Sequence, residues 1–449
     1  MLLTSAWRRL FAAGGALALL WAAVIWVAPS APSIAPDRPA EQVPIQPTTT
    51  PVSAPAGLRT VVWSGLVAPG GGRFDRFDSA SHPIVAPVNA RGQVAFYATV
   101  LHAFGREGLY IADSERVTKV AAFGDSIPGG GSLAEFGAHP LPALNNAGHV
   151  AFAAGVAGGR ATEGIFLTST EGLRVIALAG DDAPGIPTGI LVGFNAPALN
   201  DNDELAFVAN VRRGHDTLDV LYFWNGTRLQ RVIAEGDRLL RIGGTMDKIG
   251  EPALNNSGVI AFPAAIFKGP ALGGIFVAGT RDLRLLVSAG DRVPSGAMIL
   301  RFSERVAIDD DDVIAFGSYL GNDGNTREAV LVNKADGLVE VAVEGAAAPG
   351  GGRYAAFGPW PTIGAGGVVS FIAALDGAPE PLAVFVGIPN NISPVVLIDM
   401  TSARSGLVGH LTLNTVPSLG PDGAVTFATV EQESAGGNGI YCRCPPPSR

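Results

Sequence analysis

One pattern of apolar and polar positions recurs along most of the chain. A stiff aliphatic residue, a small residue and a phenylalanine follow one another, as in Val150-Ala151-Phe152. Successive phenylalanines of the seven copies are 56, 55, 55, 54, 55 and 56 residues apart, and they are Phe96, Phe152, Phe207, Phe262, Phe316, Phe371 and Phe427. Because side chains alternate between the faces of a strand, each copy predicts a strand with one large and one small face.

A polar turn precedes each of these strands. It has the form Asn-x-x-Gly, as at residues 145–148, where the glycine supplies a positive φ. Copies three and five have Asp203 and Asp312 in place of the glycine, and the last two have Gly364 and Gly420 in place of the asparagine. All four exchanges remain compatible with a tight turn.

Three further strands are predicted in each complete copy. A third strand is expected at positions such as 173–180, and a fourth ahead of the turn, as at 141–144. Four short strands in about 55 residues are typical of a β-propeller blade. The second strand contains an apolar residue 14 positions after each phenylalanine, and these residues are Tyr110, Phe166, Leu221, Phe276, Val330, Phe385 and Tyr441.

The two ends of the repeat region predict a closed ring. The last copy ends after residues 439–441 and lacks one strand, whereas residues 58–65 match that strand and precede the first copy. Closing the ring removes an open sheet edge. We therefore expect an all-β, seven-bladed β-propeller over residues 58–444, completed by its N-terminal strand and followed by a short tail at 445–449.

The first 57 residues follow a different pattern. An uncharged apolar run of 19 residues, Leu10 to Ala28, follows Arg8 and Arg9. It predicts one N-terminal hydrophobic helix within residues 1–28, acting as a signal peptide or a signal anchor. By the positive-inside rule the remainder is exported to the cell envelope, in the periplasm or at the cell surface, and is membrane-anchored or secreted. Residues 29–57 are predicted to be a proline-rich linker.

Composition narrows the functional classes. The chain has 31 Lys and Arg against 40 Asp and Glu, a net charge of −9, which argues against nucleic-acid binding. Its only cysteines, Cys442 and Cys444, are too few for a cysteine-rich zinc site, and either a bridge or two free thiols is compatible with their spacing. No metal site or cofactor is predicted.

The repeat resembles that of the bacterial tandem-repeat proteins named for an Asn-x-x-Gly-x-x-Ala-Phe motif. The resemblance spans residues 58–444, and the Ala-Phe pair is present in five of the seven copies. Members of that group are exported or surface proteins attached by varied anchors, so the resemblance implies location and repeat type. It carries no activity and no active-site residues.

Two acidic features are interpreted as structural. Linkers between blades begin with Gly-Asp, as at Asp125 and Asp237, and we expect the aspartate to accept hydrogen bonds from its own turn. Acidic turns at 201–204 and 309–312 are interpreted as solvated carboxylates, since the calcium-loop spacing is absent.

Polar residues on the innermost strands form the candidate site, because each blade brings that strand to the axis. They can bind a small polar ligand or line a water-filled channel, and the channel is the favoured interpretation. The uniform blades favour a non-catalytic binding or scaffold module for a protein or glycan. The alternative is an extracytoplasmic hydrolase or lyase in which Glu251, Glu304 and Arg305 supply acid/base groups. The candidate residues are His139, Asn195, Glu251, Glu304, Arg305 and Asn414.

Overall fold

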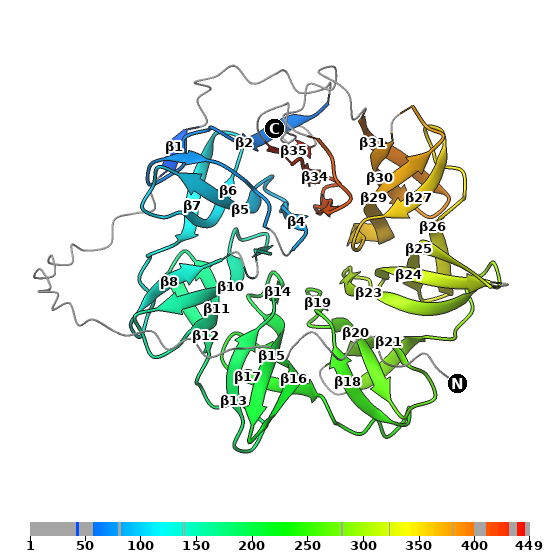
Figure 1. Cartoon of the computed structure of the whole chain (residues 1–449), viewed down its shortest axis with the longest axis horizontal. Coiled ribbons are helices and arrows are strands. Elements are labelled where there is room, and N and C mark those ends of the chain that lie inside the picture. The colour runs from blue at the N-terminus through cyan, green and yellow to red at the C-terminus, as the bar shows by residue number, and fades with distance from the viewer. Residues whose placement is uncertain are drawn as a thin grey trace, which may run out of the picture. The chain divides into compact units, whose positions relative to one another are not determined.

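The computed structural model is a ring of seven blades, as predicted (Figure 1). It describes residues 42–44, 57–79, 82–136, 138, 140–279, 282–322, 324–379, 381–398, 410–430 and 438–444. All of these belong to one compact unit, Ala40–Arg449. The predicted hydrophobic helix at 1–28 and the tail at 445–449 lie outside the described residues. Within the described residues, no helix is long and apolar enough to cross a membrane.

Each blade is an antiparallel sheet whose innermost strand is usually split into two segments. Blade 1 contains β3 (Arg73–Phe74), β4 (Ile84–Val85), β5 (Val94–Leu101), β6 (Glu107–Ala112) and β7 (Arg116–Ala122). Blade 2 contains β8 (Ser132–Glu135), β9 (Ala143–Leu144), β10 (Val150–Ala157), β11 (Glu163–Ser169) and β12 (Gly172–Leu178). Blade 3 contains β13 (Ile190–Phe194), β14 (Ala198–Leu199), β15 (Leu205–Arg213), β16 (Asp216–Trp224) and β17 (Leu229–Ala234).

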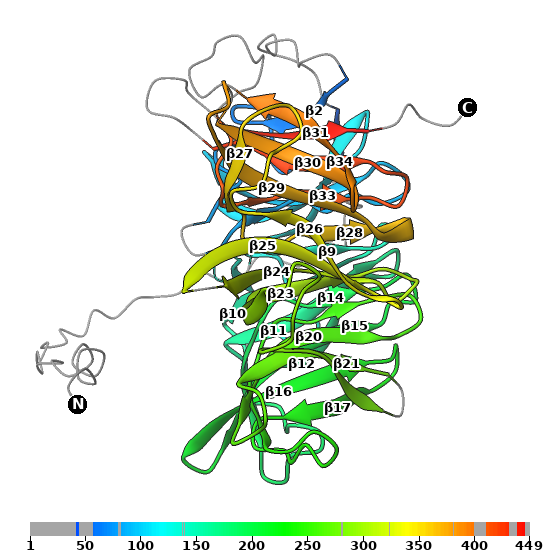
Figure 2. The same ribbon diagram turned by 90° about the vertical axis from the view of Figure 1, so that its right-hand side faces the viewer.

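The remaining blades follow the same plan, and Figure 2 shows blade 5 from the side. Blade 4 contains β18 (Thr245–Ile249), β19 (Ala253–Leu254), β20 (Ile260–Phe267), β21 (Gly273–Ala278) and β22 (Leu283–Ser288). Blade 5 contains β23 (Met298–Ile308), β24 (Ile314–Asn322), β25 (Asn325–Lys334) and β26 (Gly337–Val343). Blade 6 contains β27 (Arg353–Phe357), β28 (Thr362–Gly364), the 3₁₀ turn η1 (Ala365–Gly367), β29 (Val368–Asp376), β30 (Leu382–Ile388) and β31 (Asn391–Ile398). Blade 7 contains β32 (Thr415–Val416), β33 (Ser418–Leu419), β34 (Val425–Ala428) and β35 (Gly439–Arg443).

The repeated phenylalanines form the core, and none is more than 2% exposed. In five blades each pairs with the apolar residue 14 positions later, as Phe152 does with Phe166. In blades 3 and 5 the pairing is shifted by one residue, because Phe207 pairs with Tyr222 and Phe316 with Leu331. In these two blades the paired residues are 15 positions apart instead of 14. The two strands remain paired up to a two-residue hairpin turn, where the other blades have a longer loop.

The Asn-x-x-Gly turns join neighbouring blades. The side-chain oxygen of each buried first asparagine accepts hydrogen bonds from its own turn, as Asn200 Oδ1 does from the Glu204 amide at 3.0 Å. Its amide group donates to the next blade, and we call this series the asparagine ladder. Its members are Asn89 Nδ2 to Asn145 O (2.9 Å), Asn145 Nδ2 to Asn200 O (3.1 Å), Asn200 Nδ2 to Asn255 O (3.0 Å) and Asn255 Nδ2 to Asp309 O (3.0 Å).

The ladder changes at blade 5, where an aspartate replaces the asparagine. Asp309 is 6% exposed, and its Oδ2 accepts a hydrogen bond from the Gly367 amide at 3.1 Å. The interpretation of Asp309 as a solvated carboxylate is therefore wrong. An asparagine amide at this position donates a hydrogen bond to the next blade, whereas a carboxylate can only accept one from it. Asp203 and Asp312 adopt the positive φ expected of the glycine they replace.

The Gly-Asp linkers behave as expected. Each aspartate accepts a hydrogen bond from the backbone amide three residues earlier, which fixes the end of the outermost strand. The four contacts run to Asp125 from Ala122 (2.8 Å), to Asp181 from Leu178 (3.2 Å), to Asp237 from Ala234 (2.8 Å) and to Asp291 from Ser288 (2.7 Å).

The ring is closed by the N-terminal strand, as predicted. Strand β2 (Arg59–Trp63) pairs antiparallel with β35 and completes blade 7 in the order β2-β35-β34-β33. Val61 and Val62 of β2 are fully buried. Strands β4 and β32 also pair directly, so blades 1 and 7 are joined near the axis.

The predicted linker at 29–57 is not an unpaired spacer throughout. Residues Gln42–Pro44 form strand β1, which pairs antiparallel with β7 on the outer edge of blade 1. An unpaired outer strand exposes free N–H and C=O groups, so a neighbouring extended segment gains hydrogen bonds there. The rest of the linker up to Ala56 lies outside the described residues.

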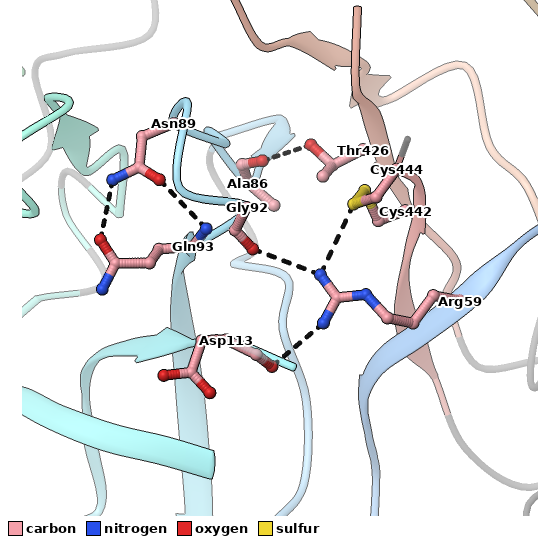
Figure 3. Close-up of a disulfide and its surroundings, with 9 residues drawn as sticks. All are labelled: Arg59, Ala86, Asn89, Gly92, Gln93, Asp113, Thr426, Cys442 and Cys444. Carbon is pink, nitrogen blue, oxygen red and sulfur yellow. Dashed lines mark hydrogen bonds between the residues drawn. A yellow bond between two sulfur atoms is a disulfide. The ribbon is translucent and has the colours of Figure 1, made fainter. Parts of the chain in front are cut away.

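A disulfide joins Cys442 and Cys444, which answers the question left open by the sequence. Arg59, on the ring-closing strand, donates a hydrogen bond to Cys444 Sγ at 3.5 Å (Figure 3). The same guanidinium donates to the carbonyls of Asp113 and Gly92, both in blade 1. The disulfide and Arg59 therefore lie where the last and first blades meet.

Candidate functional site

Five of the six predicted site residues line one cavity of about 850 Å³. The cavity begins at the axis and extends between blades 4 and 5. The sixth residue, His139, lies outside the described residues. The five that the structure brings together are Asn195, Glu251, Glu304, Arg305 and Asn414.

Interfaces between several other blades are bridged by a carboxylate, which we call the acidic clamp. A Glu or Asp in the first half of the blade's second long strand reaches the innermost strand of the next blade. These contacts are Glu107 with the Phe136 amide (3.2 Å), Glu163 with the Phe194 amide, Asp219 with Lys248 Nζ (3.1 Å) and Glu328 with the Phe357 amide (2.9 Å).

Blade 4 lacks this clamp. The equivalent position is Gly273, and its cross-strand partner is Ala265, where blade 5 has Tyr319 paired with Glu328. Ala289 occupies the position held by Glu344 in blade 5, since each donates its amide to the equivalent residue of the preceding strand. All three small residues of blade 4 line the cavity, so the cavity lies where blade 4 lacks the side chains that fill this position in blade 5.

The polar wall of the cavity is anchored by an ion pair across the two blades. Arg305 Nε lies 2.9 Å from Glu251 Oε2, and the two side chains are only 14% and 17% exposed. The backbone holds them in place, because Glu251 donates its amide to the Glu304 carbonyl and forms an isolated parallel bridge with Arg305. The Arg305 guanidinium also lies 5.5 Å from the ring centre of Trp360, in blade 6.

Lys248, on β18 of blade 4, lines the cavity on the side that faces blade 3. It lies 3.1 Å from Asp219 and 3.5 Å from Glu235. Burial opposes the charged form, but the hydrogen bond and charge of Asp219, helped by Glu235, raise the pKa of Lys248 above its usual value. The Lys248 ammonium group therefore pairs with Asp219 in the acidic clamp between blades 3 and 4.

A second cavity of about 360 Å³ adjoins the first, between blades 5 and 6. Tyr319 and Glu328 line it, and the charge of Glu328, followed by burial, raises the pKa of Tyr319. The guanidinium of Arg301 lies 4.1 Å from the ring centre of Tyr319. The two cavities share the lining residues Arg301, Phe302, Ser303, Glu304, Pro359 and Trp360.

Sequence reasoning missed the two aromatic residues of this region, Trp360 and Tyr319. The usable signal was a departure from the repeat, because Gly273 stands where four other copies have Glu or Asp. Comparing copies for apolar periodicity alone does not detect it. The described part of the chain contains no cluster of three His, Cys, Asp or Glu residues that is arranged to hold a metal ion.

Solved structures similar to this chain match it at low sequence identity. An oligogalacturonate lyase in complex with manganese is 12% identical, with a TM-score of 0.46 over 83% of this chain and 96% of that one. The polysaccharide lyase Uly1 is 11% identical, with a TM-score of 0.46 over 82% and 92%. The β-propeller domain of the Trilobed protease from Pyrococcus furiosus is 10% identical, with a TM-score of 0.33 over 74% and 98%.

No curated protein matches the chain. One family model does, over residues 54–270 and again over 254–442, and the two matches together cover nearly the whole propeller. The chain therefore belongs to this family, which is described as a family of unknown function (DUF7453).

Proposed function

We propose that the protein is an exported, non-catalytic binding propeller of the cell envelope whose ligand occupies the cavity between blades 4 and 5. The observation that carries the proposal is the loss of the acidic clamp at Gly273, beside which the cavity opens between blades 4 and 5. Binding sites occur preferentially where a regular scaffold becomes irregular.

The lining has the composition of a small-molecule site. Its apolar part includes Pro263, Ala264 and Leu272, and its polar groups converge from several blades. A volume of about 850 Å³ is within the range of small-molecule cavities. Few polar groups held rigidly in an apolar surround fix the orientation of a ligand.

The ion pair favours binding over catalysis. Glu251 and Arg305 lie 2.9 Å apart, so the carboxylate is already engaged by a guanidinium. A general acid or base must lie within hydrogen-bonding reach of the proton that it transfers. Glu304 is exposed, so this set of residues supports positioning of a polar ligand.

The test is a thermal-shift screen of the full-length protein against soluble glycans and peptides. Ala265→Tyr fills the cavity with the side chain that blade 5 carries at the same position. Phe104→Ala is the control, because Phe104 is 86% exposed on blade 1 and lies outside the cavity. We expect ligands that stabilise the wild type and the control but not Ala265→Tyr. Equal stabilisation of all three, or turnover of the ligand, would contradict the proposal.

The location is tested separately by cell fractionation. The export proposal rests on the apolar run at 10–28 and the preceding Arg8 and Arg9. The intact protein should be recovered with membranes or outside the cytoplasm. Recovery in the soluble cytoplasmic fraction with an unprocessed N-terminus would refute the export proposal.

A further inference from the structure

The two adjoining cavities form one path across strand β23. The first lies between blades 4 and 5 and the second between blades 5 and 6. The shared residues include Arg301 and Glu304 of β23 and Trp360 of blade 6. A ligand longer than one ring can therefore extend from the first cavity into the second without leaving the surface.

Strand β23 places two guanidinium–aromatic pairs along this path. Arg305 lies against Trp360 in the first cavity, and Arg301 lies against Tyr319 in the second. Such contacts hold a planar ring in a fixed orientation. Trp360 and Tyr319 are both half-buried, so part of each ring is covered and part faces the cavities.

Polar groups of both kinds surround the rings. Glu304 provides acceptors on both cavities, Glu328 provides acceptors in the second, and Asn195 and Asn414 provide both donors and acceptors in the first. The charge of Arg305 is balanced by Glu251. The path therefore has no strong excess of either charge, which favours a neutral ligand rich in hydroxyl groups.

Resting on the proposed function, we propose that the ligand is an oligosaccharide of at least two sugar residues, one beside Trp360 and another beside Tyr319. A sugar ring has an apolar C–H face, which packs on an aromatic ring, and a rim of hydroxyls, which bond to carboxylates and amides. Two aromatic rings in joined cavities suit a chain of sugars better than a single sugar ring.

The test is calorimetric titration of the full-length protein with β-1,4-linked oligomers of glucose, xylose and N-acetylglucosamine, each from one to six residues long. For one series we expect the affinity to rise at least about tenfold between the monomer and the longer oligomers and then to level off, because a second sugar ring gains the aromatic contact of Tyr319. Trp360→Ala should abolish binding at every length.

Tyr319 separates the inference from the proposed function. Tyr319→Ala should remove the gain from the longer oligomers and leave the affinity for the shortest binding oligomer unchanged. Tyr319→Phe keeps the ring and loses only the hydroxyl bonded to Glu328, so its length dependence should match the wild type. Phe104→Ala should also match it, and thermal melts should show all four variants folded.

Three results would overturn the inference. If the affinity does not depend on oligomer length in any series, Tyr319 is excluded as a second contact for the ligand, while the first cavity is kept as a binding site. Binding of a random peptide pool, with no saccharide bound, would exclude the ligand class. Saccharide binding that survives both Trp360→Ala and Ala265→Tyr would exclude the cavity itself and with it the proposed function.

Discussion

The interface between blades 2 and 3 and the interface between blades 4 and 5 are built from the same repeat but differ in what fills them. Glu163 bonds the Phe194 amide across the first, whereas Gly273 leaves the second open. The strand pairing is preserved in both cases, since Gly155 pairs with Glu163 and Ala265 with Gly273. The comparison shows that side-chain loss at one repeated position creates a cavity without altering the backbone plan.

The interface between blades 4 and 5 keeps its hydrogen bonds at the Asn-x-x-Gly turns. Asn255 Nδ2 donates to the Asp309 carbonyl at 3.0 Å, and the Asn256 amide donates to Asp310 Oδ1 at 2.9 Å. Blades 2 and 3 are joined there by the equivalent contacts of Asn145 and Asn146. The asparagine ladder therefore holds the blades together where the acidic clamp is missing.

The largest effect is expected from removing the ring closure. A chain starting at Gly70 loses β2, including the fully buried Val61 and Val62, and leaves one edge of β35 unpaired. A chain starting at Ala56 keeps β2 and, among the described strands, loses β1. In thermal melts the first should lose stability cooperatively and the second should melt close to full length. Equal midpoints for both would mean that the blades behave as an open array in which contacts are local.

A core substitution should cost less than the loss of closure but more than any change at the cavity. Phe207→Ala removes a side chain with no exposure and should lower the free energy of unfolding by about 3–5 kcal/mol. Ala265→Tyr should change it by less than about 1 kcal/mol, because the new ring enters existing space. Denaturant unfolding measures both. A cost below about 1 kcal/mol for Phe207→Ala would refute the blade register.

The asparagine ladder should contribute measurably at one position. Asn200→Ala removes the amide that bonds Asn255 and the oxygen that accepts two turn amides, so we expect a loss of about 2–3 kcal/mol. Asn202→Ala in the same turn removes one exposed bond and should cost no more than about 0.5 kcal/mol. Similar losses for both in denaturant unfolding would mean that burial of the first asparagine is unimportant.

The smallest effect is a pH dependence at the closed interface. Burial raises the pKa of Glu163, partly opposed by the hydrogen bond from Phe194 and reinforced by Glu135. Because the folded-state pKa lies above the unfolded value near 4.5, this contribution to stability is complete below that value and is lost as pH rises through the folded-state pKa. Glu163→Gln should flatten the decline in stability with rising pH. An unchanged slope between the two proteins would contradict this origin.

The fold was predictable because local patterns determine it. The period of the phenylalanines, the turn chemistry and the missing strand of the last copy were enough to predict seven blades and the closure by β2. The register of blades 3 and 5 was not predictable, since an inserted residue can lengthen either a loop or a strand. Strand β1 was missed because its pairing with β7 depends on an edge that only the assembled blade presents.

The candidate site was predictable only in part. Residues on innermost strands must approach the axis, so the sequence could indicate that Glu251, Glu304 and Arg305 lie near one another, as they do around the cavity. Apolar periodicity does not show which interface contains the cavity. The cavity between blades 4 and 5 depends on the small side-chain volumes of Ala265 and Gly273. Trp360 belongs to the next blade, and its place beside Arg305 follows from the three-dimensional curvature of the ring.

The central claim is that ligand binds where blade 4 lacks its clamp. Hydrogen–deuterium exchange of the full-length protein, with and without an oligomer that binds in calorimetry, tests it most directly. We predict that ligand-dependent protection is confined to β18, β20, β21 and β23 and to the segment around Trp360, and that the equivalent strands β8, β10, β11 and β13 at the closed interface are unchanged. Protection centred on blades 2 and 3, or on the asparagine ladder, would contradict the account.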